Sequence, residues 1–134
     1  MRVNSRSGGL FFEVAKRIIS LGGCVYGAAL IDNVVKHIRG TDLETCKLMQ
    51  GSKYVESDLN NCYVEAANDL LFEKHVLFSG TACQIAGLYA YLSTKRGISL
   101  EKLITIDIVC HGVASAKLFD EYIFFMQKKY KGDI

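Results

Sequence analysis

The sequence predicts an α/β fold with a Rossmann-like second half. Short apolar segments rich in β-branched residues alternate there with amphipathic helical segments. This order is typical of parallel strands joined by crossover helices. In the first half, a helical pattern precedes two strand-like segments that are separated only by Asp32-Asn33, which favours a β-hairpin. The chain has 134 residues, half of them hydrophobic by type, so it is one domain's worth of globular protein and not a disordered segment.

The first half of the chain is predicted to hold helices around the hairpin. Apolar residues fall on one face of the first helix, Ser7 is its predicted cap, and Gly22-Gly23 is its predicted stop. The predicted elements are a helix over 10–21, strands over 24–31 and 34–39, a short helix capped by Thr41 and ending at Met49, and a helix over 59–73.

The second half is predicted to be a βαβα unit, and residues 1–74 and 75–134 are predicted to form two regions packed as one unit. No linker or repeat divides them. The predicted elements are a strand over 76–78, a turn over 79–81, a helix over 82–94, a strand over 103–109, a turn over 110–112 and a helix over 115–129.

Charge and hydropathy exclude several classes of protein. The 16 basic and 14 acidic residues give a formal charge of +2 and are spread along the chain, so no nucleic-acid partner is expected. No apolar stretch reaches the roughly 18 residues that a membrane-spanning helix needs. The basic N-terminus precedes an apolar stretch, but charges at Glu13, Lys16 and Arg17 interrupt it, which argues against a signal peptide. We therefore expect a cytoplasmic protein.

Five widely spaced cysteines without a C-x-x-C motif indicate reduced thiols or metal ligands. Cys83 and Cys110 each follow a predicted parallel strand, and ligands bind outside the carboxyl ends of such strands. Cys83 also lies in a first helical turn, where free N–H groups and the helix dipole favour a thiolate. Burial as small core residues explains the pair equally well. For Cys24 and Cys62 core packing is the better interpretation, and Cys46 lies in a short helix without a metal-ligand neighbour.

Other polar segments give weaker signals. Ser7-Gly8-Gly9 before a helix could cradle a phosphate, because glycines let a diphosphate approach helix N–H groups. The segment Gly51-Ser52-Lys53-Tyr54 offers donors and an aromatic face, although an ordinary surface turn fits it as well. His111 could donate a hydrogen bond beside Cys110, whereas His37 is predicted to lie on the surface.

Five segments taken together resemble the coenzyme F420 hydrogenase/dehydrogenase beta-subunit family. They occur in the family's order and cover nearly the whole chain, and an ordered set is far more specific than any one motif. The segments are SRSGGLF at 5–11, GGCVYGAA at 22–29, GSKYVES at 51–57, VLFSGTACQIAGL at 76–88 and DIVCHGV at 107–113.

The resemblance implies a redox module of an iron–sulfur flavoprotein oxidoreductase. Its expected cofactors are FAD and a [4Fe–4S] cluster, with the deazaflavin F420 as a candidate acceptor. Electrons would come from a partner protein or a ferredoxin-like segment. By resemblance, the residues near the flavin are Ser7, Gly8, Gly9, Ser52, Lys53 and Tyr54, and the cluster ligands are Cys83 and Cys110.

The chain departs from the family in three ways. Alanine stands at Ala82 and Ala114, where the family usually has proline, which would fix φ in those turns. Family members are commonly longer than this chain. A cubane cluster also needs four ligands, and only two motif cysteines remain here. We therefore expect this chain to be a fragment or truncated member.

Two other functions remain open from the sequence alone. The chain could be a non-catalytic remnant that keeps the fold and docks on a partner. Alternatively, Gly80-Thr81-Ala82-Cys83-Gln84 is similar to the Pro-Cys-Gln turn of DNA cytosine-5 methyltransferases, which would make Cys83 a nucleophile.

Overall fold

The fold is built on a four-stranded mixed sheet. The computed structural model describes residues 9–130. Its strands are β1 (Cys24–Ile31), β2 (Val34–Gly40), β3 (Val76–Thr81) and β4 (Leu103–Ile108), in the order β2-β1-β3-β4. β2 pairs antiparallel with β1, while β3 pairs parallel with both β1 and β4. The prediction of an α/β fold with a hairpin and a parallel second half is confirmed.

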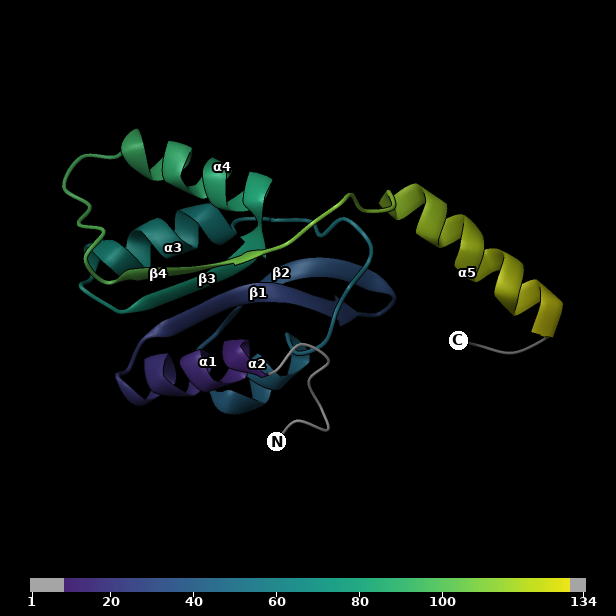
Figure 1. Cartoon of the computed structure of the whole chain (residues 1–134), viewed down its shortest axis with the longest axis horizontal. Coiled ribbons are helices and arrows are strands. Elements are labelled where there is room, and N and C mark those ends of the chain that lie inside the picture. The colour runs from purple at the N-terminus through teal and green to yellow at the C-terminus, as the bar shows by residue number, and fades with distance from the viewer. Residues whose placement is uncertain (1–8, 131–134) are drawn as a thin grey trace.

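Four helices cover the two faces of this sheet. α1 (Leu10–Ser20) and α2 (Leu43–Leu48) lie on one face, and α3 (Cys62–Leu71) and α4 (Ala82–Ser93) lie on the other (Figure 1). α5 (Ala116–Tyr130) projects away from the sheet (Figure 1). The layering is the one that crossover helices impose on parallel strands.

The backbone conformations at the ends of α1 and at the hairpin follow the sequence. α1 begins after Gly9, which has a φ of 81°; the predicted cap Ser7 lies outside the described residues. The stop at Gly22-Gly23 is confirmed, because Gly22 has a φ of 71° and the Gly23 N–H donates to the Ile18 carbonyl. Asp32 and Asn33 both have positive φ, as a tight two-residue hairpin turn requires.

Three predicted boundaries are wrong, each for a local reason. The cap of α2 is Asp42 and not Thr41, since the Asp42 carboxylate accepts the Thr45 N–H at 2.8 Å. α3 begins at Cys62 and not at 59, because Asn60 has a φ of 49° and interrupts the helix. β3 continues to Thr81, so the predicted turn over 79–81 is strand that pairs with β4.

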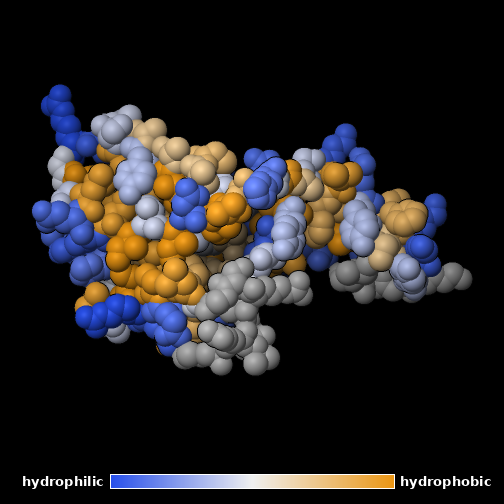
Figure 2. Space-filling view, viewed as in Figure 1, coloured by the Kyte–Doolittle hydropathy of each residue, from blue (hydrophilic) through white to orange (hydrophobic). Residues whose placement is uncertain are grey.

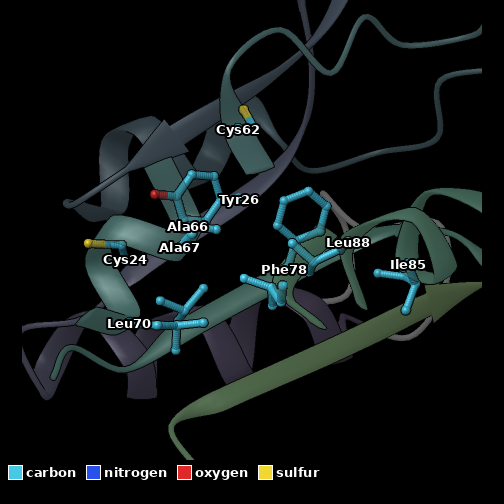
Figure 3. Packing of buried hydrophobic residues seen from close by; sticks show 11 residues of the cluster. Cys24, Tyr26, Cys62, Ala66, Ala67, Leu70, Phe78, Ile85 and Leu88 are labelled. Atoms are coloured by element: carbon cyan, nitrogen blue, oxygen red, sulfur yellow. The ribbon is translucent and has the colours of Figure 1, made fainter. Parts of the chain in front are cut away.

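Alternating residues of the strands build a core on each face of the sheet. Tyr26 and Phe78 point toward α3 and α4, where their rings stack with centroids 5.6 Å apart (Figure 3). Their neighbours Val25 and Leu77 point to the opposite face and pack with α1. Cys24 and Cys62 lie in the first core (Figure 3), which confirms the interpretation that they are core residues. Cys46 is fully buried in the second.

A buried ionic network joins the hairpin to α3. Asp69 is 5% exposed and accepts hydrogen bonds from Arg39 Nε at 2.7 Å and from the Tyr26 hydroxyl at 2.6 Å. Lys74 Nζ donates to the same carboxylate at 3.2 Å, and Arg39 also donates to Cys24 Sγ at 3.0 Å. Burial alone would raise the pKa of Asp69, but the donors from Arg39 and Tyr26 hold it well below its usual range.

Large apolar side chains remain uncovered on β4 and α5 within the described part of the chain. β4 is an edge strand whose Ile104 and Ile108 are exposed, and no residue of α5 is buried. Figure 2 shows apolar surface over the region of β4 and again on α5. The exposed apolar residues of α5 are Leu118, Tyr122, Phe124, Phe125 and Tyr130.

We expect the substitution Asp69→Asn to destabilise the fold by about 3 kcal/mol. The side chain keeps its shape but loses the charge that compensates Arg39. Breaking a buried pair costs about 3–5 kcal/mol. We take the lower end of this range because the Arg39 side chain is 31% exposed. The free energy of unfolding in urea measures the effect. The control is Glu44→Gln in the exposed Glu44–Lys47 pair, which should change it by less than about 0.5 kcal/mol; equal effects of the two substitutions would contradict the network's importance.

Candidate functional site at the carboxyl edge of the sheet

The parallel register places the two candidate cysteines at one edge of the sheet. Thr81 pairs with Ile108 at the ends of β3 and β4. Cys83 follows Thr81 by two residues, and Cys110 follows Ile108 by two residues. Both thiols belong to exposed residues. Because β3 and β4 are parallel neighbours, both cysteines follow strands that end at the same edge of the sheet.

Local hydrogen bonds hold the turn that carries each cysteine. The Thr81 N–H donates to Gln84 Oε1 at 3.0 Å, which closes the first turn of α4 around Cys83. The Thr81 hydroxyl lies 3.1 Å from Cys83 Sγ. On the other strand, the Gly112 N–H points to Cys110 Sγ at 3.4 Å, and Gly112 has a φ of 123° that favours glycine.

The structure also brings the loop over 51–58 against the segment that follows Cys110. The Glu56 N–H donates to the Ala114 carbonyl at 2.9 Å, and the Ala114 N–H donates to the Tyr54 carbonyl at 3.3 Å. Tyr54 and Cys110, which are far apart in the sequence, are thereby placed in adjoining segments. Nothing in the local sequence signals this pairing, because it depends on two irregular stretches.

The three side chains expected near the flavin in this loop differ in their surroundings. Tyr54 is 76% exposed and Ser52 is also exposed, so both are accessible. The Lys53 ammonium instead donates to the carbonyls of Leu48 at 3.2 Å and Gln50 at 2.8 Å, at the end of α2. Burial lowers the pKa of Lys53 to about 8. Lys53 therefore holds the loop on α2 in this structure and would have to leave those carbonyls to reach a phosphate.

Gly9 lies at the same edge of the sheet. α1 ends at the turn that begins β1, so it runs antiparallel to β1 and its first residue lies near the carboxyl ends of the parallel strands (Figure 1). Ser7 and Gly8 fall outside the described residues. The N-termini of α1 and α4 thus share an edge with Cys83 and Cys110.

The prediction that His37 lies on the surface is wrong. The ring is 2% exposed and stacks on Phe78 with centroids 5.5 Å apart. Its Nε2 lies 3.0 Å from the Ser79 carbonyl, and its Nδ1 lies 2.9 Å from Ser57 Oγ. Burial lowers the pKa of His37 below its usual value. The alternation of β2 could have revealed this. Val35 and His37 are two residues apart in a strand, so their side chains face the same side, and both are buried.

The described residues do not complete a site for a [4Fe–4S] cluster. Residues 9–130 contain no group of three or more His, Cys, Asp or Glu side chains that could hold a metal ion. The expected ligands Cys83 and Cys110 would supply two of the four ligands that a cubane needs. The other cysteines are buried, and burial raises the pKa of Cys24 to about 11 and that of Cys62 to about 12, which disfavours the ligating thiolate.

The family comparison agrees with this geometry. Residues 73–133 match the family model that describes the C terminus of the coenzyme F420 hydrogenase/dehydrogenase beta subunit. Over this region the chain is similar to the coenzyme F420 hydrogenase/dehydrogenase beta-subunit family. The match contains β3, α4, β4 and α5, and so both candidate cysteines. Neither a curated protein nor a solved structure matches the chain. The family is one of oxidoreductase subunits. Among residues 9–130, no helix has the length and apolar character needed to cross a membrane.

We expect two of the five thiols to react with iodoacetamide in the native protein. Cys83 and Cys110 are exposed, whereas Cys24, Cys46 and Cys62 become accessible only when the fold opens. The buried thiols should react at least about tenfold more slowly. Mass spectrometry of peptides from timed samples measures each rate, with labelling in denaturant as the control for five reactive thiols. A third fast cysteine would contradict the packing.

The lowered pKa of His37 predicts a loss of stability at acidic pH. The unfolded chain takes up its proton near pH 6.5, while the folded chain takes it up only at lower pH. The stabilisation is complete above about pH 6.5 and decreases as the pH falls toward the folded pKa. Its steepest slope is about 1.4 kcal/mol per pH unit. Urea unfolding between pH 7.5 and 5 measures it. His37→Gln should remove this slope and His75→Gln should keep it; a wild-type slope in the His37 variant would refute the assignment.

Proposed function

We propose that the chain is a redox module of an iron–sulfur flavoprotein oxidoreductase. It would pass electrons between a ferredoxin-like donor or partner and a flavin or F420-type acceptor. The observation that carries this proposal is the juxtaposition of two exposed cysteines and the Tyr54 loop at one edge of the sheet, within and beside the family-matched region.

Cys83 and Cys110 are the proposed cluster ligands of this chain. Because residues 9–130 supply only these two exposed cysteines, the remaining ligands are proposed to come from an electron-donor protein or a ferredoxin-like segment. The exposed apolar side chains of β4 and α5 support a protein partner, since large uncovered apolar surfaces mark interaction sites.

FAD is the proposed second cofactor, placed along Gly9 and the loop over 52–54. The N–H groups of the first turn of α1 favour a diphosphate, and the exposed Tyr54 ring and Ser52 hydroxyl are accessible from the same edge. A bound flavin would supply one- and two-electron transfer, while the protein supplies binding and orientation.

The test is anaerobic reconstitution of the chain with FAD, ferrous iron, sulfide and an excess of a small thiol, which can take the place of the cluster ligands that a partner would supply. We expect retained FAD and iron, with flavin bands and a broad visible absorption, and we expect Cys83→Ser and Cys110→Ser each to lower the retained iron at least about twofold. The control variant is Cys46→Ala, a buried position that should leave iron unchanged. A folded chain that retains neither FAD nor iron would overturn the proposal.

That negative result would favour the second candidate, a non-catalytic interaction module. The observation that favours it is the presence of only two exposed cysteines beside the uncovered surfaces of β4 and α5. The thiol-nucleophile alternative gains no such support. The hydrogen-bond neighbour of Cys83 Sγ is the Thr81 hydroxyl, which is not a base that could activate a thiol.

A further inference from the structure

We propose that Ser57 and Gln84 are positioning residues. Anchored on His37, they hold the loop that carries Ser52 and Tyr54 against the turn that carries Cys83. The inference rests on the proposed function only in treating this edge of the sheet as the working edge. The geometry itself concerns three segments that are separate in the sequence. They are β2, the loop over 51–58, and the stretch in which β3 ends and α4 begins.

A continuous chain of hydrogen bonds connects these segments. His37 Nδ1 lies 2.9 Å from Ser57 Oγ, and the Gln84 side-chain nitrogen donates to the same Ser57 Oγ at 2.9 Å. Gln84 Oε1 accepts the Thr81 N–H at 3.0 Å. We name this chain of bonds from His37 through Ser57 and Gln84 to Thr81 the His37 relay.

Two backbone groups fix the direction of every bond in the His37 relay. The Thr81 N–H can only donate, so it orients the Gln84 amide, and the Ser79 carbonyl orients the rest. The Ser79 carbonyl, 3.0 Å from His37 Nε2, can only accept, so Nε2 carries the proton and a neutral ring has a bare Nδ1. Ser57 must therefore donate to Nδ1, and its oxygen accepts the Gln84 amide. Because each bond then has one donor and one acceptor, the relay specifies one arrangement of its side chains.

The packing around the His37 relay leaves little room for another arrangement. His37 is 2% exposed and its ring is stacked on Phe78. Gly80 lies beneath the Gln84 side chain, and a Cβ there would sit 3.0 Å from Gln84 Oε1 and 3.6 Å from His37 Nε2. The absence of a side chain at Gly80 lets Gln84 lie across the end of β3.

The relay thereby fixes Cys83 from a distance. Cys83 stands between Thr81 and Gln84, the two residues whose mutual bond closes the turn. Ser57 lies near the end of the loop that holds Ser52 and Tyr54, next to Asp58, whose backbone pairs with β2. Its hydroxyl joins this anchored end of the loop to Gln84 and so to the turn. None of the relay's side chains needs to touch a cofactor to do this.

The first test reverses one bond of the relay in the ligand-free chain. In Gln84→Glu, the introduced carboxylate can only accept from Ser57, so Ser57 must accept from Nδ1–H and His37 becomes a cation. Its proton affinity should rise at least about tenfold, seen as one pH unit in the NMR titration of its ring. The double variant Ser57→Ala, Gln84→Glu should show a smaller rise, because the direct attraction of the carboxylate remains but the hydrogen bond through Ser57 is lost. No rise in the single variant, or an equal rise in the double variant, would overturn the relay.

The second test measures the turn itself by amide hydrogen exchange. Ser57→Ala should speed exchange of the Thr81 amide about fivefold, the equivalent of one neutral hydrogen bond. Ser57→Thr, which keeps the hydroxyl, should restore it. The Thr94 amide at the far end of α4 is the internal control in the same molecule. Unchanged exchange at Thr81, or equal acceleration at Thr94, would contradict a positioning role. Neither test involves a cofactor, so failure of the relay and failure of the proposed function give different results.

Discussion

The parallel pairing of β3 with both of its neighbours is the constraint on which this structure depends. Every residue of β3 before Thr81 is buried, so the strand has no solvent face and can only be central. Parallel neighbours end at the same edge, so Cys83 and Cys110 both follow strands that end there, and α4 begins there. The same geometry brings the start of α1 to that edge. The candidate site is therefore a consequence of strand direction rather than of any local motif.

Two polar networks hold the hairpin to the rest of the fold, and they differ in kind. The Asp69–Arg39 pair, at the start of β1 and the end of β2, is ionic, and its carboxylate is buried. It stabilises the fold only while both charges are present, because an unpaired buried charge is strongly destabilising. Closer to the candidate site, the His37 relay is neutral, because burial keeps the ring uncharged. A neutral relay places side chains near the thiols without adding a fixed charge beside them. A charged group bound at this edge would therefore not be attracted or repelled by the relay itself.

The sequence predicted the regular elements well because their periodicities are local. The hairpin follows from Asp32 and Asn33, and the order of the second half follows from alternating strand and helix patterns. What it missed depends on contacts between distant residues. Extension of β3 to Thr81 needs β4 as a partner, and burial of His37 needs Phe78 and Ser57. The pairing of Tyr54 with Ala114 and the diversion of Lys53 to the end of α2 are likewise tertiary. The spacing of apolar residues predicts helices and strands, but irregular segments have no regular spacing from which their tertiary contacts could be predicted.

The five cysteines divide into two groups by their surroundings, and this division bears on what the edge can do. Burial raises the pKa of the Cys24, Cys46 and Cys62 thiols to about 11 or above, so these three behave as small apolar core residues. Cys83 and Cys110 are exposed at neighbouring turns, each with a hydrogen-bonding neighbour of its own. Two thiols that follow adjacent strands could bind one side of a metal centre, but they could not enclose it. Any cluster bound here would keep its other side open to a second set of ligands. A surface of this kind, flanked by the uncovered apolar residues of β4, is better suited to a shared site than to an enclosed one. Under the proposed function, electrons would therefore pass across an interface at this edge.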